Sequence, residues 1–273
     1  MTELQPDQIA ERWNVSVLHY EGTFEPFTAD FAHAALDTSP IERGEQAIDI
    51  GAGPGGLALE LARRSAARVL AVDFSPAMVE RIRARAAAEG LTAVEARVMD
   101  GQALDIADEA FDLAYSIFGI ILFPNADRGF SEMRRVLRPG GRAAIVAWTA
   151  PERYELMSLL AKVIAAAAPD FAPPKSLPAQ LRFKDAQVLD EALRRAGFSN
   201  VKIVPVTGHW HIPDARSLVE NIGFAPGMAA LFGALGADRA KRVQGGLLRA
   251  LEARHGRGSF VLTAEAHLAT ALA

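Results

Sequence analysis

The sequence predicts an α/β fold, with a mostly parallel sheet flanked by helices and interrupted by helical insertions. Two observations carry this prediction. Apolar strand patterns alternate with amphipathic helix patterns from residue 47 to residue 148, and a glycine-rich turn at residues 51–56 follows the first strand. Strands that alternate with helices form parallel sheets through right-handed crossovers, and about seven strand patterns occur in all.

The elements of the predicted core follow in order. Val69–Val72 is a continuous apolar run, as a strand buried on both faces requires. Ser75 and Pro76 predict a helix start, because a hydroxyl N-cap and a proline in the first turn are typical of helix N-termini. A later helix is expected to end at Pro139–Gly141. The core strands are expected at residues 48–50, 69–72, 94–99, 111–116 and 142–148.

The alternation breaks after residue 150. Residues 153–168 are helical in pattern, and the prolines between 169 and 178 predict a loop. A sixth strand is expected at 201–206 and a final one from 260. The predicted segments are an N-terminal helical lid (1–40), the core (41–150), a helical and proline-rich insertion (151–184), a core helix with the sixth strand (185–207), a helical substrate cap (208–256) and the last strand (257–273).

Composition excludes several classes of protein. The chain has 273 residues and no cysteine, which excludes disulfides, thiolate metal sites and cysteine nucleophiles. The net charge of -4 leaves no basic surface for nucleic acid. We find no apolar run of about 20 residues and no signal pattern. Membrane insertion is therefore not expected, and a cytoplasmic location is expected. A monomer or homodimer is expected.

The glycine turn fits two cofactors. Gly51, Gly53 and Gly56 match the dinucleotide pattern G-x-G-x-x-G, whereas Gly51, Gly53 and Gly55 match the G-x-G-x-G of S-adenosylmethionine (SAM) enzymes. Asp73, about 20 residues further on, suits a ribose diol in either case. An NAD(P)-dependent oxidoreductase therefore stands as the alternative to a SAM enzyme.

Three further features favour SAM. Asp100, followed by Gly101, can accept a hydrogen bond from an adenine amino group after the third strand. Asp49 precedes the glycine turn, where an acid suits the cationic SAM and would repel a pyrophosphate. The sequence after the fourth strand lacks the second nucleotide-binding half of a dehydrogenase.

Together these blocks resemble class I SAM-dependent methyltransferases of the small-molecule type, similar to the ubiquinone and menaquinone biosynthesis enzymes. The matching blocks are residues 48–55, 72–78, 100–104, 111–116 and 135–141, in the family's order. The resemblance implies a Rossmann-like sheet in the order 3-2-1-4-5-7-6 with an antiparallel last strand.

The resemblance also implies a cofactor site. The glycines approach the methionine part of SAM, Asp73 binds the ribose, and Asp100 binds adenine. Ser116 is expected near the sulfonium, and Tyr20 is the candidate aromatic that closes over SAM, although it can equally be a helix-packing tyrosine. The implied cofactor residues are Tyr20, Asp49, Gly51, Ala52, Gly53, Asp73, Phe74, Met78, Asp100, Gly101, Gln102 and Ser116.

The sequence defines the acceptor less closely. Methyl transfer by in-line displacement needs alignment, and a base only where the nucleophile is protonated. His209 and His211 are the candidate bases, or else exposed residues at a strand end; a metal is not expected, because no third ligand accompanies them. A small, hydrophobic or aromatic acceptor is expected, with O-, N- and C-methylation all open. A SAM-binding protein of this fold that methylates nothing is a third hypothesis. The candidate acceptor-binding residues are Trp13, His19, Phe118, Trp148 and Trp210.

Overall fold

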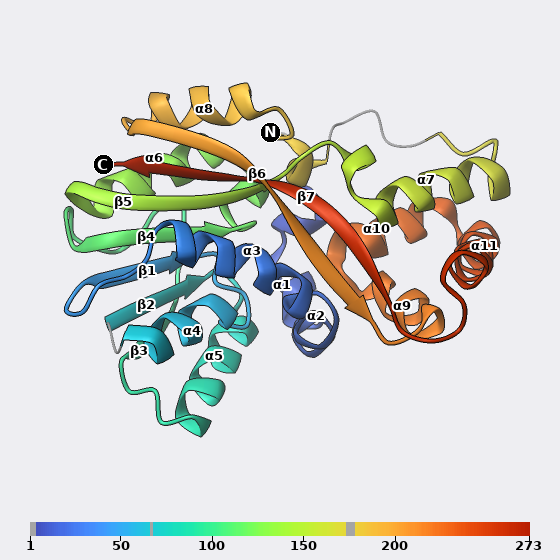
Figure 1. The fold of residues 1–273 in the computed structure, drawn as a ribbon, viewed down its shortest axis with the longest axis horizontal. Helices are drawn as coiled ribbons and strands as arrows, with labels where there is room; N and C mark the ends of the chain where they lie inside the picture. The colour runs from blue at the N-terminus through green and yellow to red at the C-terminus, as the bar shows by residue number, and fades with distance from the viewer. Residues whose placement is uncertain (1–3, 66–67, 173–177) are drawn as a thin grey trace.

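The protein folds around one seven-stranded sheet in the order β3-β2-β1-β4-β5-β7-β6 (Figure 1). The computed structural model describes residues 4–65, 68–172 and 178–273. Strands β1 to β5 are parallel to their neighbours, and β7 runs antiparallel between β5 and β6. The predicted strand order is therefore confirmed. The strands are β1 (Gln46–Ile50), β2 (Arg68–Asp73), β3 (Val94–Val98), β4 (Phe111–Ile117), β5 (Leu137–Trp148), β6 (Ser199–Ile212) and β7 (Phe260–Leu272).

Helices form a layer on each side of this sheet. In one layer α3 packs on α4 and α4 on α5, and in the other α6 packs on α8. Short helices of the N-terminal segment lead into α3. These elements are η1 (Pro6–Gln8), α1 (Ala10–Asn14), α2 (Val17–Thr23), α3 (Glu25–Thr38), α4 (Gly56–Ser65), α5 (Pro76–Ala88), η2 (Ile120–Leu122), α6 (Ala126–Val136) and α8 (Ala186–Arg195).

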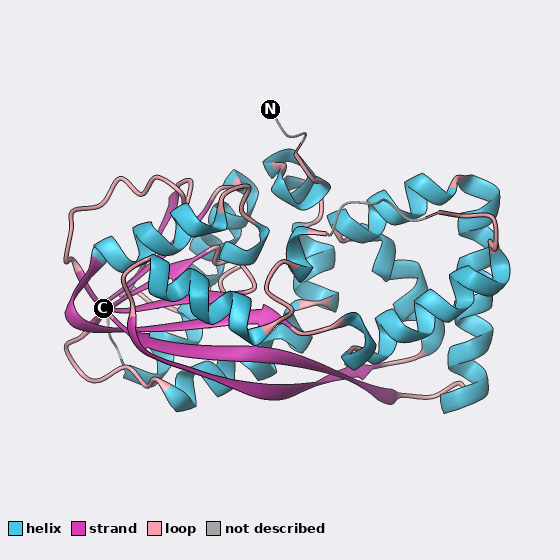
Figure 2. Ribbon diagram, turned by 90° about the horizontal axis from the view of Figure 1, so that it is seen from above, coloured by secondary structure: helices cyan, strands magenta, loops and turns pink. Residues whose placement is uncertain are grey.

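The remaining helices form a lobe beyond the end of the sheet. Both views show β6 and β7 extending out of the sheet toward this lobe (Figures 1 and 2). Within it, α11 packs on α7, α9 and α10. The lobe consists of η3 (Pro151–Arg153), α7 (Glu155–Ala167), α9 (Ala215–Asn221), η5 (Ile222–Phe224), α10 (Pro226–Leu235) and α11 (Ala237–His255), whereas η4 (Ala179–Leu181) packs on η2 and β5.

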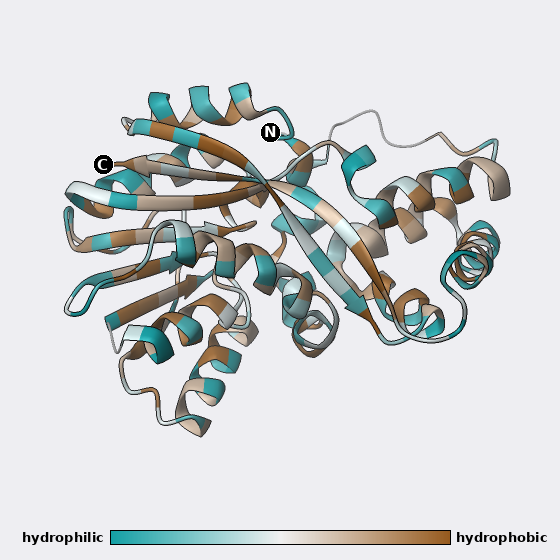
Figure 3. Cartoon of the chain, viewed as in Figure 1, coloured by the Kyte–Doolittle hydropathy of each residue, from teal (hydrophilic) through white to brown (hydrophobic). Residues whose placement is uncertain are grey.

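The hydrophobic core lies between the sheet and its helices. Ile48, Leu113 and Ile145, on three neighbouring strands, are completely buried. Hydropathy colouring shows apolar residues along the central strands and polar ones on the outer sides of the helices (Figure 3). Burial on both faces explains why these strands are continuous apolar runs in the sequence.

Two boundaries differ from the sequence-based expectation. The sixth strand was expected to end at 206, but β6 continues to Ile212, so the expected boundary at 207 falls inside a strand. Helix α6 ends at Val136, and residues 139–141 belong to β5, where the register with β4 shifts. Pro173 and Pro174 of the predicted proline-rich loop lie outside the described residues.

The helices are too short or too polar to cross a membrane singly, within the part of the chain that the structure describes. The pair Ala215–Phe224 and Pro226–Leu235 reaches the necessary length and hydropathy only when taken together, across a bend of 93°.

Candidate functional site

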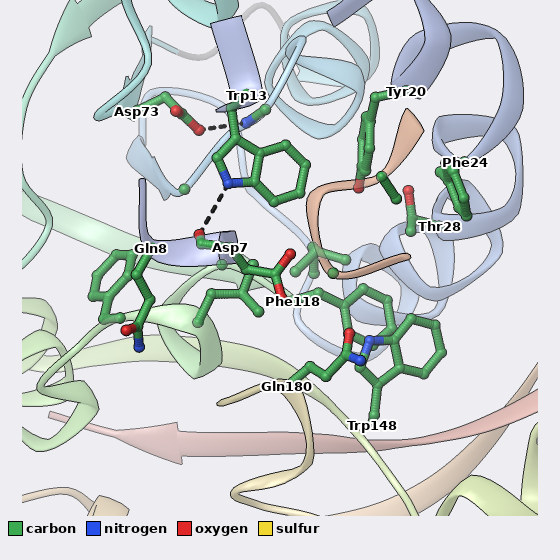
Figure 4. Close-up of a pocket in the computed structure, with 18 of the residues that line it drawn as sticks. Asp7, Gln8, Trp13, Tyr20, Phe24, Thr28, Asp73, Phe118, Trp148 and Gln180 are labelled. Carbon is green, nitrogen blue, oxygen red and sulfur yellow. Dashed lines mark hydrogen bonds between the residues drawn. The ribbon is translucent and has the colours of Figure 1, made fainter. Parts of the chain in front are cut away.

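A cavity of about 470 Å³ opens where the parallel strands end. Its walls come from the carboxyl ends of β1, β2 and β4, from the N-terminal helices, and from the helical lobe (Figure 4). Ligands of open α/β sheets bind outside the carboxyl ends of the strands, so this is the expected place for a cofactor.

The glycine turn forms one edge of the cavity. Gly51 has φ +74°, and a Cβ at this position would lie 2.8 Å from Cα of Gly119. The N–H groups of Gly51 and Ala52 donate to the carbonyl of Val72 at 2.9 and 3.1 Å, which fixes the turn against β2. Gly51 and Gly53 line the cavity, whereas Ala52 does not.

Asp73 holds the same turn from the end of β2. Its carboxylate accepts hydrogen bonds from the backbone N–H of Gly53 and of Ser75, both at 2.9 Å. Burial raises the pKa of Asp73 to about 6. The backbone N–H of Phe74 also donates to this carboxylate, and because a carboxylate has about four acceptor positions, the side chain can still accept a hydrogen bond from a hydroxyl group in the cavity.

The next wall suits a flat heterocycle. Asp100 accepts the N–H of Gln102 at 2.9 Å, which shapes the turn after β3. A Cβ at Gly101 would lie 2.5 Å from the ring of Phe123, so the glycine lets this ring approach the backbone. Phe123 lines this wall together with the residues expected to bind adenosine, which are Phe74, Met78, Asp100, Gly101 and Gln102.

Asp49 and Ser116 do not line the cavity. Ser116 is completely buried; its hydroxyl donates to the carbonyl of Ile50 at 2.8 Å and accepts the N–H of Ile120 at 3.0 Å. It therefore fastens β4 to β1 and, in this structure, is not exposed to a ligand. Asp49 is 2% exposed, and its Oδ2 has no hydrogen-bond partner among the described residues.

Because Asp49 is buried, we expect the free energy of unfolding to depend on pH. Burial, and then the charge of Asp73, raise the pKa of Asp49 to about 8, against about 3.9 in an unfolded chain. The folded protein thus holds a proton that the unfolded chain releases above pH 4, so stability falls as the pH rises toward 8. Between pH 5 and 7, the free energy of unfolding should fall by up to about 1.4 kcal/mol per pH unit more than in Asp49→Asn.

Urea denaturation at pH 5, 6 and 7 measures this difference without any ligand. Asp105→Asn, at an exposed position, is the control and should follow the wild type. If the free energy of unfolding changes with pH equally in the wild type and in Asp49→Asn, Asp49 is ionised throughout this range.

Aromatic rings line much of the cavity. The rings of Phe118 and Trp148 stack at 3.8 Å, and Trp148 stacks on Tyr154 at 5.4 Å. Phe118 has φ +59°, a conformation that costs a non-glycine residue about 1–3 kcal/mol and that the surrounding structure must enforce. Tyr20 packs edge-on against Trp13 at 5.6 Å (Figure 4). Phe118, Trp148, Trp13 and Tyr20 line the cavity as expected, and Tyr154 was missed.

The histidine candidates lie elsewhere. His209 and His211 are exposed on β6, and neither lines the cavity. The side chain between them, Trp210, is 2% exposed and stacks on Phe27 at 5.0 Å, so it belongs to the core. Because successive side chains of a strand alternate between faces, a buried Trp210 places both histidines on the outer face. The structure therefore does not support a catalytic role for them.

His19 is also outside the cavity. Its ring stacks on Phe224 at 3.5 Å, at the outer side of the N-terminal helices. Among the described residues, no group of three or more His, Asp and Glu side chains is arranged to hold a metal ion.

The charges around the cavity are all of one sign. Four acidic side chains line it, and none of its described lining residues is a lysine, arginine or histidine. Such a site suits a cationic ligand and opposes a pyrophosphate. The acids are Asp7, Asp73, Asp100 and Glu265.

An ion pair joins the N-terminal helices to the glycine turn. The Arg85 guanidinium contacts the Glu25 carboxylate at 2.7 Å and donates to the carbonyl of Pro54 at 3.0 Å. Glu25 also accepts a backbone hydrogen bond from Gly56, at the start of α4. Gly56 therefore lets the Glu25 carboxylate approach the start of α4, because a Cβ there would lie 2.6 Å from Glu25 Oε1. No sequence motif indicated this connection, because its partners lie far apart in the chain.

Comparison with known proteins agrees with this site. Residues 47–141 match a family model described as a methyltransferase domain. An uncharacterized protein of Mycobacterium tuberculosis is 36% identical over 109 residues, which are 40% of this chain and 39% of that protein. Methyltransferase GfsG of Streptomyces halstedii is 39% identical over 106 residues, 38% of each chain. The chain therefore matches less than half of the length of these relatives.

A solved structure shares the fold over most of the chain. The [4+2]-cyclase SpnF superposes with a TM-score of 0.56 at 23% identity, over 89% of this chain and 79% of that one. The specific resemblance to ubiquinone-type enzymes does not emerge from these comparisons. The strand order and the glycine turn agree with the match of residues 47–141 to a methyltransferase domain.

Proposed function

We propose that the protein transfers the methyl group of SAM to a small acceptor with an apolar or aromatic body. One observation carries this proposal: a single cavity joins the Gly51, Asp73 and Asp100 edge to the aromatic walls at Trp148 and Tyr154. The donor site and the enclosed acceptor space are thus continuous, as an in-line displacement requires.

The residues of the chain fit SAM. Gly51 and Gly53 allow close approach of the methionine part, Asp73 offers acceptors for the ribose, and Asp100 with the Gly101 backbone suits adenine. When bound, SAM supplies an activated methyl group on a sulfonium. The aromatic walls exclude water and orient the acceptor, and alignment is a large part of catalysis in such transfers.

We also propose which partners the protein has. The acceptor is a small molecule, since the cavity is closed in by helices and carries only acidic side chains among its described lining residues. The net charge of -4 gives nucleic acid no electrostatic attraction to the surface. A monomer or homodimer is proposed for its assembly.

Calorimetry with SAM and with NAD tests the cofactor. SAM is expected to bind with a Kd of about 1–100 μM, and NAD at least 100-fold more weakly because its pyrophosphate would meet acidic walls. Tight NAD binding without SAM binding would overturn the proposal. If SAM binds but labelled methyl reaches no acceptor in a broad panel, the protein uses SAM without methylating, as the third hypothesis states.

A further inference from the structure

Asp7 places a carboxylate in the wall of the cavity. It lies on η1, is 9% exposed, and lines the cavity beside Trp13 (Figure 4). The segment that carries it is held in place, because Trp13 Nε1 donates to the Asp7 carbonyl at 2.9 Å and Ala179 N donates to Gln5 Oε1 at 2.7 Å. Asp7 is therefore fixed at this wall by contacts on both sides.

The Asp7 carboxylate has no ion-pair partner among the described residues. Its hydrogen bond comes from the backbone N–H of Gly227, where the missing side chain lets the carboxylate approach: a Cβ there would lie 3.0 Å from Oδ2. The charge of Arg12 acts on Asp7 only weakly, as this arginine is exposed. Another acid that lines the cavity, Glu265, forms an ion pair with Arg153 at 3.1 Å.

A buried carboxylate without a cation is costly. A charge removed from water is stabilised only by pairing and hydrogen bonding, and burial accordingly raises the pKa of Asp7. The ligand that fills the cavity is the remaining source of a positive charge.

The neighbouring walls favour the same kind of ligand. Trp148 stacks on Phe118 and on Tyr154, at 3.8 and 5.4 Å between ring centroids, and all three residues line the cavity. Aromatic faces attract ammonium groups within about 6 Å of the ring centroid. An acid and an aromatic wall in one enclosed space recognise a cation with an apolar body.

We propose that the methyl acceptor is a small organic amine, bound as its ammonium ion by Asp7 against the aromatic wall of Phe118, Trp148 and Tyr154. This rests on the proposed methyltransferase function. Before transfer the ammonium gives one proton to water or to Asp7. The nitrogen lone pair then forms the N–C bond as the C–S bond breaks, sulfur keeps that electron pair, and S-adenosylhomocysteine is left.

Matched ligands that differ only in charge test the proposal. Calorimetry in saturating S-adenosylhomocysteine would compare 2-(naphthyl)ethylamine, 2-(naphthyl)ethanol and naphthylacetate. We expect the amine to bind at least tenfold more tightly than the alcohol and the carboxylate to bind most weakly. Equal affinities, or a tighter alcohol, would overturn the proposal.

Asp7→Asn assigns the effect to this side chain. Asparagine keeps an oxygen for the Gly227 N–H, so the fold is retained and the thermal midpoint serves as the check. Amine affinity should fall at least tenfold, while the affinities for the alcohol and for S-adenosylhomocysteine stay within about twofold. If Asp7→Asn instead lowers the affinity for S-adenosylhomocysteine, or leaves the affinity for the amine unchanged, Asp7 does not bind the acceptor.

The two proposals fail in different ways. If neither SAM nor S-adenosylhomocysteine binds, the proposed function is wrong whatever the amine does. If both bind and the amine shows no preference over its alcohol, the function stands and only the acceptor class is wrong.

Discussion

Asp73→Ala is expected to weaken SAM binding by about 2–4 kcal/mol, because the carboxylate serves two purposes at once. It holds the backbone N–H groups of Gly53 and Ser75 at 2.9 Å, and in the proposed function it also offers charged acceptors to the ribose. The variant loses both the ligand contacts and the anchor of the glycine turn. Such a loss corresponds to a Kd about 30 to 700 times higher.

Calorimetry of the purified variant measures this loss, with two comparisons. Asp73→Asn keeps one oxygen acceptor and should lose less. Asp105→Ala, at an exposed position away from β2, should bind SAM as the wild type does. Unchanged affinity in Asp73→Ala, with the fold intact by circular dichroism, would remove Asp73 from the cofactor site.

Gly51→Ala is expected to lower the free energy of unfolding by about 2–5 kcal/mol and to abolish measurable SAM binding. Its φ of +74° disfavours any side chain, and the new Cβ would lie 2.8 Å from Cα of Gly119. The backbone of one of the two turns has to move. That movement displaces the surface on which the methionine part of SAM is proposed to lie.

Gly44→Ala separates these two causes. Gly44 also has a positive φ, +92°, but a Cβ there would have nothing within 4 Å. Gly44→Ala should lower the free energy of unfolding only by the backbone strain, about 1 kcal/mol. The difference between the two variants in urea denaturation is thus the cost of the contact with Gly119, and equal losses would show that this contact is easily relieved.

The parts of the site that sequence could predict are those with local causes. The glycine turn, Asp73 and the turn after β3 each follow a strand within a few residues, and parallel strands bring their carboxyl ends to one edge. Their positions at the cavity therefore follow from the order of the elements. The alternation of strands and helices likewise predicted the core between residues 47 and 148.

The failures have long-range causes. The prediction that β6 ends at residue 206 missed its pairing with β7, in which Trp210 lies opposite Leu262. This pairing extends the strand and turns His209 and His211 outward. Asp7 reaches the cavity through a contact with Gly227, and residues so distant in sequence leave no local pattern. Ser116 stands at a strand end as predicted, but its hydroxyl is used by neighbouring backbone groups.

The length of β6 and β7 has a consequence for how acceptor preference can change. Strand β6, of 14 residues, starts in the sheet and ends beneath the helical lobe, and β7, of 13 residues, runs back from the lobe into the sheet. The donor edge belongs to residues 47–148, whereas several acceptor walls are supplied by segments inserted around this hairpin. Exchanging α9 to α11 at its tip would therefore alter the shape of the chamber while the donor edge keeps its own supports. Under the proposed function, new acceptor specificities would arise by replacing the lobe while the cofactor edge is kept.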